Sequence, residues 1–90
     1  MGFRFTRHAE DKIRTELLKF GIDKVVVIET IRNPDETLYD TKTGRYVAIN
    51  YSRRIAVIYE RNLEILIITV IYCGIIDRLV SWRKRSGRWV

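Results

Sequence analysis

Glutamine is absent from this chain, and cysteine, proline and histidine each occur once. The single cysteine, Cys73, cannot form an internal disulfide and suits a reducing compartment, so we expect a cytoplasmic protein. One histidine and one cysteine cannot make a closed metal site with the usual ligand spacing. The sequence also has no glycine-rich phosphate loop and no nucleophile elbow, so we expect neither a metal nor a cofactor. The lack of glutamine beside abundant Ile, Arg and Glu is a bias described for proteins from hot environments, that is, for a thermophile source.

A long hydrophobic run is also missing. The most apolar stretch, residues 65–76, lies between Glu64 and Asp77 and is shorter than the roughly 18 residues that a membrane helix needs. Its content of Ile, Val, Thr and Tyr favours a strand instead. The first residues, MGFRFTRHAEDK, are too polar and too charged for a signal peptide. We therefore predict a soluble sheet and no membrane partner.

Basic residues outnumber acidic ones, and the excess lies in the second half of the chain. The formal net charge is +6, and residues 41–90 contain ten Lys and Arg against three Asp and Glu. Such a balance points to an acidic partner, which can be nucleic acid, an acidic protein or an anionic membrane surface. A chain of 90 residues makes one small domain. We expect a single domain over residues 1–90, with the partner bound by its second half.

Hydrophobic periodicity predicts an α+β fold. Thr6 is a good cap for a first helix that Gly21 ends, and Asp23 can cap a second helix. After the second helix the pattern changes to alternating apolar residues separated by turn signals. The expected strands are residues 3–6, 37–40, 45–51, 54–60 and 63–72, and the expected final helix lies within residues 74–85. We predict two N-terminal helices packed on a four- to five-stranded, mainly antiparallel sheet, with its core at residues 3–72 and a basic C-terminal helix and tail at residues 74–90.

Two tight turns in the second half predict which residues oppose each other in the sheet. The first places Arg45 opposite Glu60, as a cross-strand ion pair. The second places Ile55 opposite Ile68. The last strand is apolar on both faces and should therefore lie inside the sheet. The strand at residues 37–40 is left as an edge that could pair with a second copy in a homodimer.

The same register predicts the faces of the sheet. We expect the two N-terminal helices to cover the more apolar face, which carries Val47, Ile49, Ile58 and Ile67. The opposite face gathers Tyr46, Asn50, Tyr59 and Tyr72 around Val57 and Ile68. The final helix should place Ile75, Ile76, Leu79 and Trp82 on one side and basic residues on the other.

Four short motifs resemble a known family in their order and spacing. They are FTRHAEDKI around His8, GIDKV at Gly21, RNPDE at Asn33 and ITVIY ending at Tyr72. Over residues 3–72 they resemble the RelE/ParE toxin superfamily, and more closely its small RelE-like branch that is similar to the BrnT toxins. The resemblance implies an RNA-cleaving toxin that acts on free RNA or on the ribosome and that an antitoxin protein holds inactive.

The resemblance also implies where the chemistry would lie. RelE-like enzymes cleave RNA through its own 2′-hydroxyl, with basic side chains and often a tyrosine around the scissile phosphate. Arg54 matches the arginine that opens the penultimate strand, and Tyr72 lies where the last strand delivers a polar residue. Arg53 is the alternative to Arg54, because the expected register puts Arg53 on the face of Tyr72. His8 is the fourth candidate, since histidine exchanges protons near neutral pH.

The sequence departs from the family pattern directly after the last strand, where active RelE-like toxins have a basic cluster and this chain has Cys73 and Gly74. Its basic residues occur elsewhere, and the candidates for binding a nucleic-acid backbone are Arg45, Arg61, Arg83, Lys84, Arg85 and Arg88. Trp82 and Trp89 among them suit base stacking, while Trp82 fits docking on the core nearly as well. Two alternatives stay open: a non-catalytic nucleic-acid-binding relative, and a protein-interaction module whose tyrosine-lined face receives a partner helix.

Overall fold

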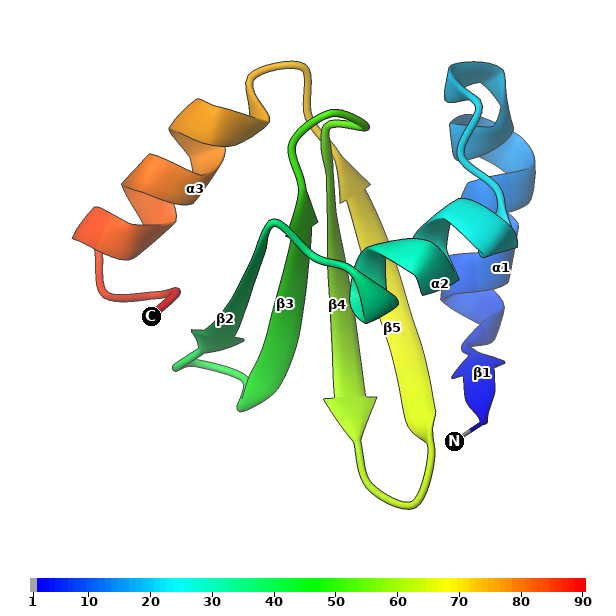
Figure 1. Ribbon diagram of the computed structural model, residues 1–90, viewed down its shortest axis with the longest axis horizontal. Coiled ribbons are helices and arrows are strands. Elements are labelled where there is room, and N and C mark those ends of the chain that lie inside the picture. The colour runs from blue at the N-terminus through cyan, green and yellow to red at the C-terminus, as the bar shows by residue number, and fades with distance from the viewer. Residues whose placement is uncertain (1) are drawn as a thin grey trace.

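The computed structural model describes residues 2–90 of the chain. These residues contain three α-helices and five strands, joined by turns (Figure 1). In chain order they are β1 (Phe3–Phe5), α1 (Arg7–Lys12), α2 (Lys24–Arg32), β2 (Glu36–Asp40), β3 (Arg45–Asn50), β4 (Ile55–Arg61), β5 (Ile65–Tyr72) and α3 (Ile76–Arg85). A π-helical turn, η1 (Ile13–Leu17), and a 3-10 turn, η2 (Leu18–Phe20), continue α1. The predicted α+β class is confirmed.

The helix ends follow local sequence signals. The Thr6 hydroxyl accepts a hydrogen bond from the backbone N–H of Ala9 at 3.1 Å, and a carboxylate oxygen of Asp23 accepts one from Val26 at 3.0 Å. Each bond satisfies a backbone donor that the first turn of a helix leaves without a partner. Gly21 ends η2 with a φ of 75°, a left-handed conformation that costs glycine little. All three predicted cap positions are confirmed.

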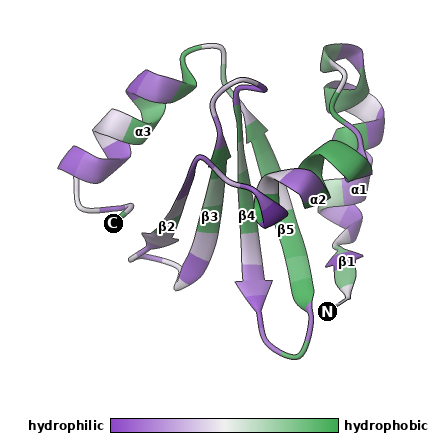
Figure 2. Ribbon diagram, in the orientation of Figure 1, coloured by the Kyte–Doolittle hydropathy of each residue, from purple (hydrophilic) through white to green (hydrophobic). Residues whose placement is uncertain are grey.

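The strands form one mixed sheet in the order β1-β5-β4-β3-β2. β1 runs parallel to β5, and the other neighbouring pairs are antiparallel. β5 lies between β1 and β4, as its apolar composition on both faces predicts, and Figure 2 shows it as hydrophobic along most of its length. The start of α1 lies against β5, and the hydroxyl of Thr6 donates a hydrogen bond to the carbonyl of Ile68 at 2.8 Å.

The predicted register holds for one hairpin and fails for the next. Between β3 and β4, Tyr46 opposes Tyr59 as expected, and Arg45 forms an ion pair with Glu60 at 3.1 Å. Between β4 and β5, Ile55 opposes Tyr72 and not Ile68. The hairpin loop is longer than a two-residue turn, and the register shifts again at a β-bulge between Ile58 and Tyr59.

The predicted assignment of helices to sheet faces is wrong. α1, η1 and α2 cover the face that carries Ala48, Val57, Tyr59, Ile67 and Val70, so they lie on the tyrosine side. The opposite face, with Val47, Ile49, Ala56 and Ile58, is covered by α3 and the C-terminal residues. The sequence interpretation treated tyrosine as polar, whereas its ring is mostly apolar and the Tyr59 ring is buried. The changed β4–β5 register also exchanges two isoleucines: Ile67 lies on the tyrosine side with Tyr59, and Ile68, expected among the tyrosines, packs on the opposite face.

The hydrophobic core extends beyond residue 72. Ile76 and Val80 of α3 are buried against the sheet, and Trp89 is only 2% exposed. Trp82, which the periodicity predicted on the inner side of this helix, is 50% exposed. Ile76 and Leu79 face the core as predicted, whereas Ile75 is exposed like Trp82 and Val80 is buried in addition. Trp89 is the tryptophan that docks on the core.

The C-terminal residues also occupy the edge of β2. Tyr39 and Val90 exchange two backbone hydrogen bonds at 2.9 and 3.0 Å, and Asp40 forms a β-bridge with Trp89. The part of the predicted free edge at Tyr39 and Asp40 is therefore paired with residues 89 and 90 of the same chain. No helix in residues 2–90 is long and apolar enough to cross a membrane.

Candidate functional site: an arginine-lined cleft

Asp40, at the end of β2, fixes one wall of the candidate site. Its carboxylate is only 5% exposed and accepts hydrogen bonds from Nε of Arg88 at 2.9 and 3.1 Å. It also accepts bonds from the backbone N–H groups of Lys42 and Thr43 and from Nε1 of Trp89. Burial alone would raise the pKa of Asp40, but these donors together lower that pKa to about 2. The ionised carboxylate thus holds the C-terminal residues against the sheet.

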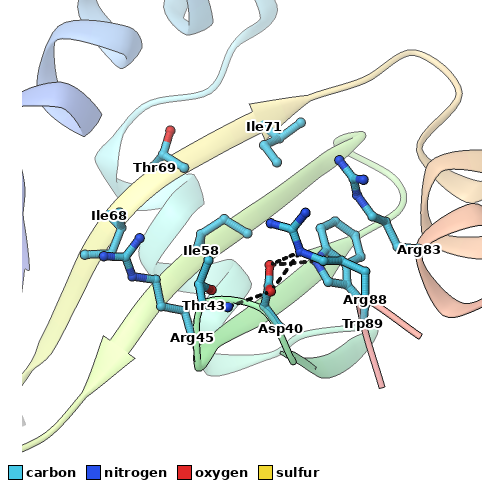
Figure 3. A pocket seen from close by; sticks show the side chains of 10 residues that line it. All are labelled: Asp40, Thr43, Arg45, Ile58, Ile68, Thr69, Ile71, Arg83, Arg88 and Trp89. Atoms are coloured by element: carbon cyan, nitrogen blue, oxygen red, sulfur yellow. Dashed lines mark hydrogen bonds and ion pairs between the residues drawn. The ribbon is translucent and has the colours of Figure 1, made fainter. Parts of the chain in front are cut away.

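Beside Asp40 lies a cleft of about 200 Å³ between the sheet and the C-terminal residues (Figure 3). Its lining consists of Asp40, Thr43, Arg45, Ile58, Ile68, Thr69, Ile71, Arg83, Arg88 and Trp89. Figure 3 shows the three arginine side chains along one side of this space and Thr69 and Ile71 of β5 along the other. We call it the arginine cleft. It combines cationic groups, two hydroxyls and an apolar floor.

The three arginines of the arginine cleft keep donors free for a ligand. Arg45 uses its Nε to bind Glu60, and Arg88 uses its Nε to bind Asp40. Nε of Arg83 is buried without a hydrogen-bond partner in residues 2–90, and its guanidinium lies 5.7 Å from the centre of the Trp89 ring. Within the same residues the terminal Nη groups of these three side chains make no hydrogen bond. A guanidinium has five N–H donors, so each can still bind an anion through a pair of them.

His8 does not line the arginine cleft but contacts one of the residues that do. Its Nε2 lies 3.0 Å from the hydroxyl of Thr69, which lines the cleft. This contact is possible because β1 ends at Phe5, so the first turn of α1 stands beside the edge of β5. A side chain that can exchange protons thus lies next to a lining residue of the cleft.

The other predicted catalytic residues lie elsewhere, at the end of the sheet near Gly21. The Tyr72 ring stacks on Phe20, with the ring centres 4.0 Å apart and an interplanar angle of 6°. An Nη atom of Arg53, in the turn before β4, lies 3.5 Å from the carbonyl oxygen of Gly21, the residue after Phe20. Arg54 has a φ of 60° and bonds the backbone of the residue after Tyr72 through its carbonyl. The four predicted catalytic residues are thus divided between two places.

The remaining predicted binding residues are outside the arginine cleft. Lys84 binds Glu36, which also accepts a hydrogen bond from the hydroxyl of Tyr51. These two bonds lower the pKa of Glu36, and burial together with the Glu36 contact raises the pKa of Tyr51 to about 12. Arg85 lies on the outer side of α3, and Arg61 lies on the opposite sheet face beside Phe3 and Ile65.

Sequence reasoning identified the arginines of the cleft but missed the residues that organise them. Asp40 before Thr-Lys-Thr-Gly is a recognisable turn signal, since Asp often accepts bonds from the backbone of the next residues. Nothing in the sequence pairs it with Arg88 and Trp89, because they are distant in the chain. Thr69 could not be placed either, since its orientation depends on the bulge in β5.

No protein-family model matches this chain, and neither a curated protein nor a solved structure is found to be similar to it. Within residues 2–90, no group of three or more His, Cys, Asp and Glu side chains could hold a metal ion. The candidate site therefore has to be interpreted from its own geometry.

Proposed function

We propose that the arginine cleft binds the sugar-phosphate backbone of RNA. The observation that best supports this is that Arg45, Arg83 and Arg88, from three separate segments, line one cleft with Nη groups that have no partner in residues 2–90. Guanidinium groups bind phosphate oxygens through paired N–H donors. The buried Nε of Arg83 adds a donor that an anion would satisfy.

In this proposal the protein is a RelE-like endoribonuclease of the toxin-antitoxin type. The 2′-hydroxyl of the RNA attacks the adjacent phosphorus, and the bond from phosphorus to the 5′ oxygen breaks. One product then ends in a 2′,3′-cyclic phosphate and the other begins with a 5′-hydroxyl. Arg45 and Arg83 neutralise charge on the reacting phosphate. His8, held against Thr69 at the cleft, exchanges the proton of the attacking or the leaving oxygen.

The test is incubation of the purified protein with RNA, with and without ribosomes, followed by analysis of the new ends. We expect cleavage by the wild type and at least a roughly hundredfold lower rate for His8→Ala, because general acid-base catalysis contributes about that much or more. Tyr72→Phe should cleave normally, since the Tyr72 ring is engaged with Phe20 away from the cleft. Loss of cleavage in Tyr72→Phe with normal cleavage by His8→Ala would place the chemistry at the Phe20 end of the sheet.

A non-catalytic RNA-binding protein is the second candidate. The separation of Arg53 and Tyr72 from His8 favours it, because of the four predicted catalytic side chains only His8 contacts a residue that lines the cleft. Intact RNA in the cleavage experiment, together with binding that depends on Arg45 and Arg83, would select this candidate. Absence of both cleavage and binding would contradict the proposed function altogether.

A further inference from the structure

A row of three tyrosines crosses the sheet on the face opposite to the arginine cleft. Tyr39 of β2 opposes Tyr46 of β3, and Tyr46 opposes Tyr59 of β4. Adjacent ring centres are 5.7 Å apart in both pairs, with an edge contact in the first and a stack in the second. Tyr59 is 3% exposed, whereas Tyr39 and Tyr46 are 42% and 38% exposed. The tyrosine row, defined by these three residues, thus has a buried end and an open end.

The open end is left uncovered by the way α2 packs. The side-chain amide of Asn50 donates to the hydroxyl of Thr30 at 3.0 Å and fixes α2 over the far end of β3. In Figure 1, α2 crosses in front of β4 and β5, and no helix lies in front of the first half of β3. Tyr39 and Tyr46 therefore present aromatic surface to solvent on a rigid sheet.

The surroundings of the tyrosine row are cationic. Arg61, two residues beyond Tyr59 on β4, lines a hollow on the same face and makes no ion pair within residues 2–90. Lys42, in the turn after β2, likewise has no ion pair among those residues. The residues of β2 and β3 that share this face with the row are Thr37, Ala48 and Asn50, none of which is acidic. An aromatic surface with positive charge on both sides suits an anionic partner that also has flat rings.

We propose that the tyrosine row is a stacking platform for the unpaired bases of single-stranded RNA. Unpaired bases can lie on exposed aromatic rings, whereas the bases of a duplex are covered by their own stacking. Arg45 and Tyr46 are neighbours on β3 and point to opposite faces. A strand that passes around this end of the sheet can therefore place phosphates at the arginine cleft and bases on the tyrosine row. The inference rests on the proposed function and adds its substrate class.

The test compares dissociation constants for a labelled oligouridylate of about 12 nucleotides and for an RNA hairpin duplex. Tyr39→Leu/Tyr46→Leu removes both exposed rings and keeps apolar side chains, and we expect it to weaken oligouridylate binding by roughly tenfold or more. Tyr39→Phe/Tyr46→Phe keeps the rings and should bind like the wild type. Trp82→Leu removes an exposed ring far from the row and serves as the control. Duplex binding should be unchanged in every variant.

Two results would overturn this inference. One is that the leucine variant binds oligouridylate as tightly as the wild type while Arg45→Ala/Arg83→Ala loses binding, which leaves the proposed function standing. The other result is that the wild type binds neither RNA, which overturns the proposed function as well. Unfolding curves are measured for all variants, and we expect the leucine pair to unfold cooperatively like the wild type.

Discussion

Replacing Trp89 with alanine is expected to lower the free energy of unfolding by about 3–5 kcal/mol, the range for removing a large aromatic side chain from a core. Trp89 is almost fully buried, contacts the sheet face of Val47 and Ile49, and donates its Nε1 to Asp40. A domain of this size has a total stability of roughly 5–15 kcal/mol. The substitution should therefore leave a substantial unfolded population at moderate temperature.

Trp82 provides the matched control, because it is the same residue type nearby in the chain and is half exposed. Trp82→Ala should cost less than about 1 kcal/mol, since surface substitutions usually have small effects. Urea unfolding followed by far-UV circular dichroism measures both variants without depending on tryptophan fluorescence. Equal destabilisation by the two substitutions would contradict the role assigned to the C-terminal residues.

The second large effect is expected at Asp40. Its pKa in the folded protein is about 2, below the ordinary value of 3.8, so folding favours the ionised carboxylate. The resulting stability is fully present above about pH 4 and is lost as the pH falls towards about 2. The shift corresponds to about 2 kcal/mol, since one pKa unit is about 1.4 kcal/mol.

Asp40→Asn should remove this pH dependence and also leave Arg88 without its partner. We expect a loss of about 2–3 kcal/mol near neutral pH, the magnitude for removing a buried partner of charged hydrogen bonds. The difference between wild type and variant should shrink as the pH is lowered from about 4 to about 2. Urea midpoints measured across this pH range test the prediction. Asp77→Asn, an exposed acid in α3, is the control, and it should behave like the wild type at each pH.

Local signals predicted the parts of the fold that depend on neighbouring residues. The caps at Thr6, Asp23 and Gly21 depend on backbone groups within a few positions, and the strands depend on short alternating patterns. The β3–β4 register was predictable for the same reason, because one tight turn fixes it.

The errors arose where tertiary packing decides the outcome. The β4–β5 register depends on a longer loop and a bulge, which no composition signal marked. The helix-covered face was misassigned because Tyr59 was treated as a polar residue, although its ring is buried. The role of Trp89 depends on Asp40, and the two are brought together only by the complete fold.

The residue types of the candidate site were predictable from the sequence, but their positions in the fold were predictable only in part. The basic second half predicts a phosphate-binding surface, and this stays a prediction, whereas the structure does bring Arg45 and Arg83 to one cleft. Arg53 and Tyr72 lie against Gly21 and Phe20 and not with His8. The position of His8 beside Thr69 follows from the short β1, whose end sets where α1 begins.

The most direct test of the account is the salt dependence of RNA binding, measured by fluorescence anisotropy with a labelled oligouridylate. Each phosphate contact with a single strand contributes about −0.7 to the slope of log affinity against log salt concentration. The account predicts that Arg45→Ala/Arg83→Ala flattens this slope by roughly 1.4 relative to the wild type. Arg78→Ala, an arginine on the outer side of α3, should leave it almost unchanged. The same slope for the wild type and the double variant would contradict RNA binding at the arginine cleft.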